Sequence, residues 1–372
     1  MSKRINTPIF FLIVALSAST TFKTFGSTIE SKVANRSLNH VQSIGFNIQN
    51  ILPKGYVKDA SVDYTTYIQA ALDKYSNVVF PAFPLLITDK GLSLNSNQNV
   101  TFLKGGSLVL QPSGQPNYQM IRIHDVSNVT ITGMVLKGDK YTHTTKTGEW
   151  GMGVSIRGAS SVQINSSTIE QCWGDGIYIA GTAKTPFSDH VVLNDITCND
   201  NRRNAISVIS VRDFKINKGL LSNTSGTPPM CGLDLEPNNN SNVLDNIQVN
   251  DLITKNNLYG ISFYLSPLNG SVPKASNVTI TNHQDIGSKT AVQFGSRGAN
   301  ISGQVVIQNA SWTDNNLPVK IVNYEPGNGA KVIFKGVKVF QTQNGLKRDV
   351  GIGVFNNMRR SLQPGTLGVQ IQ

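Results

Sequence analysis

Two acidic side chains stand at alternate positions of the short apolar stretch 231–237, whose sequence is CGLDLEP. In a β-strand, Leu233 and Leu235 would face one side and Asp234 and Glu236 the other. Aspartate is depleted from strands, and like charges on one face repel, so this pair lowers local stability. We interpret the two carboxylates as catalytic; the alternative is an exposed face whose acids are solvated.

A third candidate catalytic carboxylate, Asp175, lies between two glycines in the stretch 173–176. The glycines indicate a tight backbone that holds the acid in a defined place, although an Asp-Gly turn without a function explains the pattern as well. Hydrolysis of a glycosidic bond needs one protonated acid and one carboxylate, and crowded acids raise the pKa of at least one of them. Asp234 and Glu236, at alternate positions of one strand, would be ~6.6 Å apart. Asp175, two coils before the strand of Asp234, would be ~9.6 Å from that strand. Both separations are nearer to the ~6.5–9.5 Å of inverting glycosidases than to the ~5–5.5 Å of retaining ones.

Candidate substrate-binding residues lie near these acids in the sequence. Arg202 and Arg203 are adjacent, and two such guanidinium groups can clamp a carboxylated or sulfated sugar bidentately; the alternative is a solvated corner. The insertion 138–150 contains His143 and Glu149. A long loop of this kind usually forms the wall or lid of a groove, although both residues could be plain loop surface.

An internal repeat positions these residues. Pairs of apolar residues separated by one residue recur at Val129-x-Ile131, Val162-x-Ile164, Val191-x-Leu193, Phe214-x-Ile216, Ile247-x-Val249 and Val278-x-Ile280. An asparagine follows four of these pairs at one fixed offset: Asn165, Asn194, Asn217 and Asn250. Because Asn tolerates left-handed backbone geometry and its amide can bond to the same residue one repeat away, we expect an asparagine ladder.

A second family of short strands alternates with the first. Its members cover 120–124, 151–158, 175–181, 204–210, 231–237, 259–265, 290–296 and 317–324. One coil cannot bury its own apolar face, so the pattern predicts stacked coils with a continuous core, which is a parallel β-helix. An amphipathic helix over 63–74, with Asp63 as N-cap, would close its N-terminal end. We expect an extension over 27–54, the β-helix domain over 55–345 and a C-terminal cap or tail over 346–372.

Stacking in register would arrange the outward side chains in columns with a spacing of ~4.8 Å. The first column consists of Gly153, Gly176, Ala205, Gly232, Gly260 and Ala291. Such small residues leave the backbone open to a flat ligand, or they merely fit a tight corner. The second column reads Arg122, Ser155, Tyr178, Ser207, Asp234, Ser262, Gln293 and Lys320, and the third His124, Arg157, Ala180, Ile209, Glu236 and Tyr264. Tyr178, Tyr264, Arg157 and Trp173 supply the rings and hydrogen-bonding groups that sugars need, although tyrosine is also an ordinary strand residue.

The helix, the strand ending at Phe80-Pro81 and the coils that follow resemble the pectate lyase superfamily, over about 55–345. This superfamily includes polygalacturonase-type glycoside hydrolases and phage tailspike depolymerases. The resemblance implies a single-stranded right-handed parallel β-helix and an activity on carbohydrate. The chain lacks the Gly-His-Gly of polygalacturonases, the Arg-x-Pro-x-x-Arg of pectate lyases and the Asp-Pro-His of alginate epimerases. The reaction therefore has to be inferred from the chain's own residues.

The N-terminus and the composition limit the partners. Residues 1–26 are typical of a signal peptide, because Lys3 and Arg4 precede a short apolar stretch, so we expect a secreted or periplasmic protein without a membrane span. The net charge of +11, without basic runs that carry interleaved aromatics, favours an anionic polysaccharide over nucleic acid. The three irregularly spaced cysteines indicate small core residues rather than a metal site or a disulfide framework.

Three classes of function remain open. We expect a glycoside hydrolase that cleaves a uronic-acid-containing polysaccharide with a carboxylate acid and base and without a cofactor. The alternative is a polysaccharide lyase, in which one of the adjacent arginines would neutralise the sugar carboxylate and the base would be His143, Tyr178 or Arg157. Asp234 and Glu236 would then hold calcium. The third class is a non-catalytic carbohydrate-binding β-helix.

Overall fold

The computed structural model describes residues 45–296, 301–322, 329–362 and 368–372. All of them belong to one unit, Gly45–Gln372. The predicted signal peptide and the predicted extension up to residue 44 lie outside the described residues. Within the described ranges, no helix is both long enough and apolar enough to cross a bilayer.

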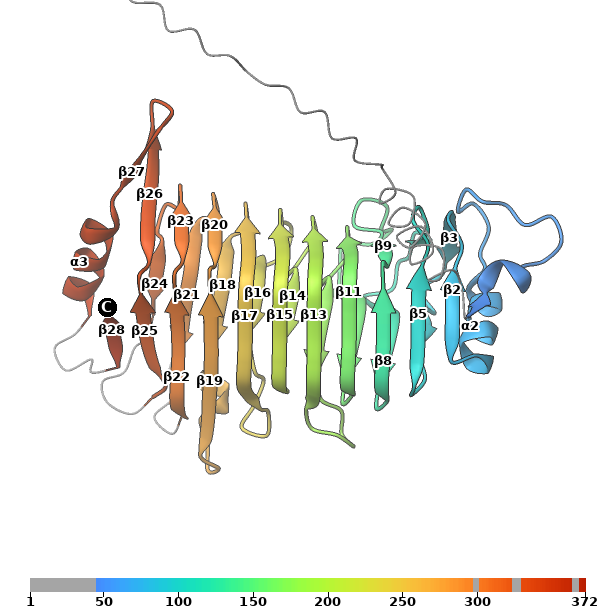
Figure 1. Ribbon diagram of the computed structural model, residues 1–372, viewed down its shortest axis with the longest axis horizontal. Helices are drawn as coiled ribbons and strands as arrows, with labels where there is room; N and C mark the ends of the chain where they lie inside the picture. Colours follow the sequence, from blue (N-terminus) through green and yellow to red (C-terminus); the bar gives the residue numbers. More distant parts are fainter. Residues whose placement is uncertain (1–44, 297–300, 323–328, 363–367) are drawn as a thin grey trace, which may run out of the picture. The chain divides into compact units, whose positions relative to one another are not determined.

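One of the two sheets contains nine strands, which pair in parallel with one another (Figure 1). These strands are β4 (Leu92–Ser93), β7 (Asn117–His124), β10 (Trp150–Arg157), β12 (Ile177–Ala180), β14 (Ile206–Val208), β16 (Cys231–Leu235), β18 (Tyr259–Tyr264), β21 (Thr290–Ser296) and β24 (Val319–Ile321). The chain leaves this nine-stranded sheet after each strand and returns to it one coil later, so strands far apart in sequence become neighbours.

The other sheet contains nineteen strands and forms two faces of each coil. Its strands are β1 (Phe46–Asn47), β2 (Asn77–Phe80), β3 (Pro84–Ile87), β5 (Gln98–Phe102), β6 (Ser107–Leu110), β8 (Ser127–Thr132), β9 (Val135–Lys137), β11 (Ser160–Glu170), β13 (Ser188–Asn199), β15 (Val211–Ser222), β17 (Leu244–Lys255), β19 (Lys274–Thr281), β20 (Gln284–Ile286), β22 (Ile301–Gln308), β23 (Ser311–Thr313), β25 (Lys331–Lys335), β26 (Lys338–Gln343), β27 (Leu346–Asp349) and β28 (Val369–Ile371). Strand β11 pairs with β8 over its first half and with β9 over its second, so it bends from one face to the next. Among the described strands, every pairing is parallel except that of β26 with β27. The predicted single-stranded right-handed parallel β-helix is confirmed.

The apolar residues of the repeat fill the core of the coils. All six predicted pairs on the nineteen-stranded sheet are buried, and so are Leu233 and Leu235 on the nine-stranded sheet. Burying one such side chain contributes about 1.5–3 kcal/mol, so the stacked rows supply much of the stability of the fold. Cys172, Cys198 and Cys231 are free and buried, which confirms the prediction that they are core residues.

The predicted asparagine ladder is present. The side-chain amide of Asn194 donates to Asn165 at 2.8 Å, Asn217 donates to Asn194 at 3.0 Å, and Asn250 donates to Asn217 at 3.1 Å. The asparagines themselves do not have left-handed backbone geometry. The residues with positive φ are those that directly follow them: Ser166, Asp195, Lys218 and Asp251. The turn is made one residue later, and each asparagine stays on its strand, where neighbouring coils bring the amides into contact.

Helices lie at both ends of the described strands (Figure 1). Helix α2 (Thr65–Lys74) buries Ile68, Ala71 and Leu72, and it begins two residues later than predicted. Its N-cap is Tyr64, but the Asp63 carboxylate still accepts a hydrogen bond from the Thr65 amide at 2.8 Å. At the other end, the predicted cap or tail contributes β27, helix α3 (Gly351–Ser361) and β28. Two 3₁₀ turns complete the description, η1 (Ile48–Asn50) and η2 (Ser266–Leu268).

A chain of buried hydrogen bonds crosses the core between the last coils. The indole of Trp312 donates to Nδ1 of His283 at 3.1 Å, so the neutral imidazole carries its proton on Nε2. That nitrogen donates to Thr254 Oγ1 at 2.7 Å, and Thr254 donates to Asp285 at 2.6 Å. All four side chains are buried and each is hydrogen-bonded to the next, so the arrangement is structural.

Acid is expected to destabilise the fold through His283. Burial lowers the pKa of this imidazole from 6.5 to about 3. The folded protein holds the neutral ring, whereas the unfolded chain takes up a proton below pH 6.5; the stability contributed by His283 is therefore present above that pH and lost as the pH falls toward 3. At a pH two units below the unfolded pKa, the loss is about 2–3 kcal/mol.

Urea unfolding at neutral pH and in mild acid measures this effect. His283→Gln should lose clearly less free energy of unfolding on acidification than the wild type does. His190→Gln is the control, because the side chain of His190 is 64% exposed, and it should behave as the wild type. An identical acid loss in the wild type and in His283→Gln would contradict the assignment.

Candidate active site

The nine-stranded sheet aligns the predicted second column without interruption. Each member pairs with the next in the order Arg122, Ser155, Tyr178, Ser207, Asp234, Ser262, Gln293 and Lys320. The third column is only partly aligned: His124 pairs with Arg157, and Arg157 pairs with Ala180. Farther along, β14 ends at Val208, and a register shift places Tyr264 opposite Ser296.

The predicted first column faces the core rather than a ligand. A Cβ atom on Gly153 would lie 2.5 Å from Ile169 and 2.9 Å from Cys172, both of which are core residues. Ala205 and Ala291 are fully buried in the same core. The expectation of an outward row open to a flat ligand is therefore wrong. The small residues fit a tight corner, because the chain enters each strand of the nine-stranded sheet there.

Asp234 is almost fully buried although it lies in the outward column. Its exposure is 1%, which rules out a solvated surface acid. Its Oδ2 accepts a hydrogen bond from Asn204 Nδ2 at 3.1 Å, and the Ser262 hydroxyl also bonds to it. Burial, together with the nearby Glu236 carboxylate, raises the pKa of Asp234 well above its usual value. Asp234 is thus the acid in this cluster that is best suited to hold a proton.

Glu236 is the accessible partner of this pair, with 31% of its side chain exposed. Its Oε2 lies 3.0 Å from Nη2 of Arg203, in a charge-assisted hydrogen bond. One buried acid and one accessible, ion-paired carboxylate therefore stand two residues apart along the chain.

Asp175 lies behind these groups and has no exposed surface. It accepts hydrogen bonds from the Asn204 amide at 3.1 Å and from Ser207, and Nη1 of Arg203 lies 3.3 Å from its Oδ2. Burial raises its pKa to about 6, against the opposing charge of Arg203. These contacts favour a positioning role for Asp175, and its catalytic role stays a prediction.

Arg203 joins the carboxylates to one another. Besides Asp175 and Glu236, its Nε lies 3.7 Å from Oε2 of Glu149, and only 13% of its side chain is exposed. This guanidinium is neutralised by the chain's own acids, so the contacts do not support the predicted clamp on a substrate anion at this residue.

Arg202 points elsewhere and forms part of a stack. Its guanidinium lies 3.8 Å from the centre of the Trp173 ring and donates to the Gly148 carbonyl at 2.8 Å. The imidazole of His143 stacks on the same indole, with 3.9 Å between the ring centres. The His143 side chain is buried, with Nδ1 2.8 Å from Asp139 and Nε2 3.1 Å from Thr145. His143, Trp173 and Arg202 thus brace the insertion 138–150 rather than line an open face.

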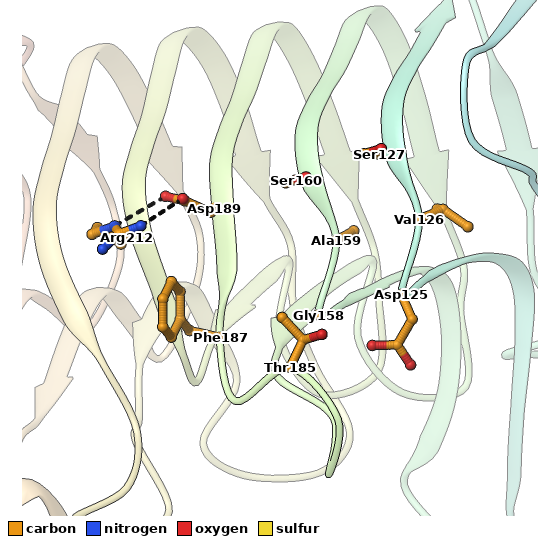
Figure 2. Close-up of a pocket in the computed structure, with 10 residues that line it drawn as sticks. All are labelled: Asp125, Val126, Ser127, Gly158, Ala159, Ser160, Thr185, Phe187, Asp189 and Arg212. Carbon is orange, nitrogen blue, oxygen red and sulfur yellow. Dashed lines mark hydrogen bonds and ion pairs between the residues drawn. The ribbon is translucent and has the colours of Figure 1, made fainter.

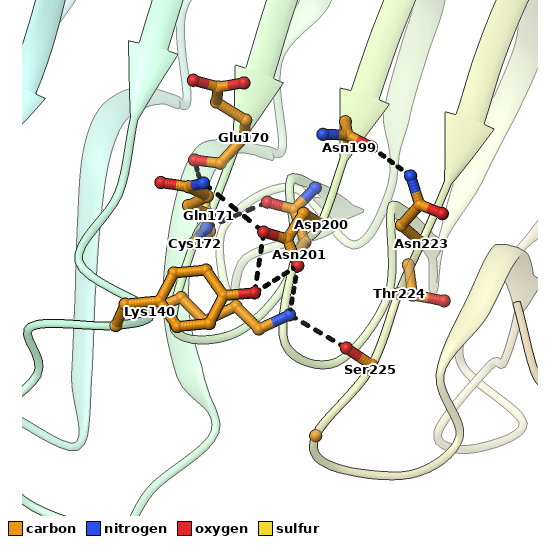
Figure 3. Close-up of polar contacts among 12 residues, drawn as sticks. Lys140, Glu170, Gln171, Cys172, Asn199, Asp200, Asn201, Asn223, Thr224 and Ser225 are labelled. Atoms are coloured by element: carbon orange, nitrogen blue, oxygen red, sulfur yellow. Dashed lines mark hydrogen bonds and ion pairs between the residues drawn. The ribbon is translucent and has the colours of Figure 1, made fainter. Parts of the chain in front are cut away.

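Polar contacts tie the start of this insertion to later coils (Figure 3). Lys140 Nζ lies 2.6 Å from Asp200 and 3.1 Å from Ser225, and the Tyr141 hydroxyl lies 2.9 Å from both oxygens of Asp200. With both ends held, the insertion delivers Glu149 to Arg203 at the edge of the nine-stranded sheet.

The two predicted sugar-binding tyrosines differ in their surroundings. Tyr178 is partly buried, and the Arg157 guanidinium lies 4.7 Å from the centre of its ring. Tyr264 is exposed at the end of β18. Of the two, Tyr264 has the more accessible ring.

Sequence reasoning missed Asn204, which connects the acids. Its backbone amide donates to Asp175. Its side-chain oxygen Oδ1 accepts from the Cys231 amide at 2.8 Å, and its side-chain Nδ2 donates to Asp234. Because Oδ1 is held by the Cys231 amide, Nδ2 of the same side chain points toward Asp234. The available signal was its position directly after Arg203, at the same edge as Asp175 one coil earlier.

A separate pocket of about 380 Å³ lies where the nine-stranded sheet passes into the nineteen-stranded sheet (Figure 2). Arg212 and Asp189 form a bidentate ion pair on its wall, with Nη2 2.7 Å from Oδ2. Within the described ranges, one group has the arrangement of metal ligands, Asp189, His190 and Asp213, but this ion pair already occupies Asp189. None of the predicted site residues lines this pocket.

Comparison with known proteins identifies the family. A family model described as "Protein of unknown function (DUF1565)" matches residues 56–272. Two curated relatives come from Bacillus subtilis (strain 168). The uncharacterized protein YclG is 26% identical over 60% of this chain and 44% of its own length, and the SPbeta prophage-derived uncharacterized protein YorA is 28% identical over 39% and 28%. The chain therefore spans less than half the length of these relatives.

Solved structures with the same fold include sugar-bound proteins. A tailspike protein of E. coli bacteriophage HK620, in complex with a hexasaccharide, has a TM-score of 0.63 at 13% identity over 83% of this chain and 58% of its own. An iota-carrageenase in complex with iota-carrageenan fragments has a TM-score of 0.58 at 12% identity over 73% of each chain. The A-module of a mannuronan C-5 epimerase from Azotobacter vinelandii has a TM-score of 0.50 at 12% identity over 80% and 89%. At these identities the likeness shows the fold alone.

Proposed function

The chain belongs to the DUF1565 family of proteins of unknown function, and we propose that it is a secreted glycoside hydrolase that cleaves an acidic polysaccharide. One observation carries this proposal: a buried acid with a raised pKa, Asp234, stands two residues before an accessible, ion-paired carboxylate, Glu236. The tailspike protein and the carrageenase that share the fold are bound to sugar fragments. By analogy of fold, carbohydrate is the first ligand class to test.

The proposed roles follow from the two environments. Asp234 holds the proton that the leaving sugar oxygen needs, and Glu236, which pairs with Arg203, takes a proton from the attacking water. Their ~6.6 Å spacing along the strand leaves room for that water, as in an inverting enzyme. Because Asp234 is covered in the free protein, the side chains above it have to shift when the sugar binds.

The lyase alternative is less well supported by the contacts. His143, a proposed base, is buried with both ring nitrogens engaged. A calcium ion at Asp234 and Glu236 would have to compete with the Arg203 guanidinium for Glu236. These contacts favour acid-base hydrolysis over elimination.

A polysaccharide panel tests the proposal. We expect the purified chain to release reducing ends from an acidic polymer such as polygalacturonate, alginate or carrageenan, without unsaturated products that absorb in the ultraviolet. Calcium chelation should leave the rate unchanged. Ultraviolet-absorbing products would indicate the lyase instead, and binding without any product would indicate a non-catalytic β-helix.

A further inference from the structure

Three basic side chains gather on the first coils of the nine-stranded sheet, away from the acids. Arg122 and His124 lie on β7, and Arg157 lies on β10 directly opposite His124. The buried Ser155 joins them, because its hydroxyl accepts from Arg157 Nε at 3.1 Å and lies 2.9 Å from His124 Nε2. Burial, and then the charges of Arg157 and Arg122, lowers the pKa of His124 to about 4, so the imidazole is neutral at neutral pH. Two permanent cations therefore remain at this place.

Neither guanidinium has a carboxylate partner among the described residues: no Asp or Glu oxygen lies within the 4.0 Å of an ion pair. Arg122 donates to Ser93 Oγ at 2.9 Å and to the Lys90 carbonyl at 2.6 Å. Arg157 contacts Ser155 and the Tyr178 ring. Asp125 lies at the turn after β7, where its carboxylate accepts from Thr182 at 2.7 Å.

Arg203 and Arg212 differ from this pair. Arg203 is surrounded by three carboxylates, and Arg212 forms a bidentate pair with Asp189. A half-buried guanidinium that lacks an internal anion keeps its capacity for charge-assisted, bidentate bonds to a ligand. The contacts therefore point to Arg122 and Arg157, rather than Arg202 and Arg203, as the groups that meet an anion from outside.

We propose that Arg122 and Arg157 form an anion subsite, which binds a carboxylate or sulfate group of the polysaccharide at the N-terminal coils of the nine-stranded sheet. This inference rests on the proposed function, because it assumes that the polymer lies along the sheet that carries Asp234 and Glu236. Strand β10 is three spacings and β7 four spacings from β16, so the anion binds ~14–19 Å from Asp234.

The separation of charge along the sheet gives the polymer a direction. A sugar anion is attracted to Arg122 and Arg157 and repelled by the partly exposed Glu236, which directly follows β16. The charged sugar is therefore held several units away from the bond that is cut. Tyr178 lies between the two regions, on β12, and Arg157 holds its ring in place.

Calorimetric binding to defined probes tests the subsite, with Asp234→Asn as the common background so that no probe is cleaved. The carboxylate arm compares tetragalacturonate with its methyl ester, and the sulfate arm compares sulfated with unsulfated dextran oligosaccharide. At least one charged probe should bind ~10-fold or more tightly than its neutral counterpart, with an affinity that falls as salt rises. Arg122→Gln and Arg157→Gln should each remove at least ~10-fold of that affinity. If only the carboxylated probe binds more tightly than its neutral counterpart, the subsite binds carboxylate. If only the sulfated probe does, it binds sulfate.

Matched variants keep this test decisive. Lys215→Gln removes one exposed positive charge from the nineteen-stranded sheet and should bind as the background does. Arg157→Lys keeps the charge without the planar fork, and it should bind between the background and Arg157→Gln. Thermal midpoints are measured for every variant, and Arg157→Lys carries the test if Arg157→Gln does not fold.

Distinct results would overturn the subsite. Equal affinity for charged and neutral probes, no binding of either charged probe, or arginine variants that match Lys215→Gln would each contradict it. Hydrolysis of a neutral polymer that both arginine variants perform normally would contradict the subsite and leave the hydrolase standing. Arginine-dependent anion binding by a chain that cleaves no polymer would contradict the hydrolase and leave the subsite standing.

Discussion

Asp234→Asn and Glu236→Gln are each expected to lower kcat/KM on the acidic polymer by ~10²–10⁴-fold, the usual effect of removing a general acid or base. Asn at 234 keeps the shape of the side chain and an oxygen that accepts from Asn204, but it has no acidic proton to transfer to the leaving group. Gln at 236 can still contact Arg203, but it is too weak a base to activate water. Both variants should keep the thermal midpoint of the wild type, because neither side chain belongs to the apolar core. Initial rates of reducing-end release measure the effect.

Asp195→Asn is the charge-matched control for this experiment. Asp195 lies on the nineteen-stranded sheet, exposed and paired with Lys218 at 2.8 Å, so its replacement should leave the rate unchanged. Normal rates in both Asp234→Asn and Glu236→Gln would move the chemistry away from β16. A loss of rate accompanied by a large fall in the thermal midpoint would instead indicate that the acids are structural.

Much of the fold and one column of the site could be predicted from the sequence, because both depend on strand periodicity and on the repeat. Side chains alternate along a strand, and coils of similar sequence stack in register, so aligning the buried pairs also aligned Tyr178 with Ser207 and Ser207 with Asp234. The asparagine ladder followed from the same logic. Features that depend only on residue spacing, such as the aligned column and the asparagine ladder, can therefore be predicted from the sequence.

Prediction from residue spacing fails where the chain turns a corner or where a side chain is long. Gly153 stands two residues before Ser155, yet a Cβ there would point into the core, against Ile169 and Cys172. The partners of Arg203 come from the insertion, from one coil before and from one coil after. Such a reach cannot be inferred from register alone.

The insertion 138–150 was the least predictable part, because nothing in it repeats. Its length suggested a wall or lid, but the burial of His143 depends on Asp139 within the insertion and on Trp173 outside it. The same contacts leave Glu149 within reach of Arg203. A loop residue that looks titratable in sequence can thus be a support whose contacts determine where another loop residue lies.

Arg203→Gln is expected to destabilise the fold by about 3–5 kcal/mol at alkaline pH, the usual cost of removing one partner of a buried ion pair. The loss should be smaller in mild acid. Burial already raises the pKa of Asp175 from 3.8 to about 6, and Arg203 opposes that rise. A raised folded pKa means that the stability linked to Asp175 is present below pH 3.8 and is lost as the pH rises through 6. Without Arg203 the pKa rises further, so the loss continues to higher pH.

Urea unfolding on either side of neutrality measures this difference, and the double variant Asp175→Asn/Arg203→Gln is the control. With no carboxylate left at position 175 beside the missing guanidinium, the double variant should recover part of the stability that Arg203→Gln loses at alkaline pH, and its unfolding should depend less on pH. Asp175 would then be a buried acid whose ionisation depends on Arg203, the guanidinium that also pairs with Glu236. If Arg203→Gln were equally destabilised at both pH values, the cost would come from lost packing, and the proposed effect of Arg203 on the ionisation of Asp175 would be wrong.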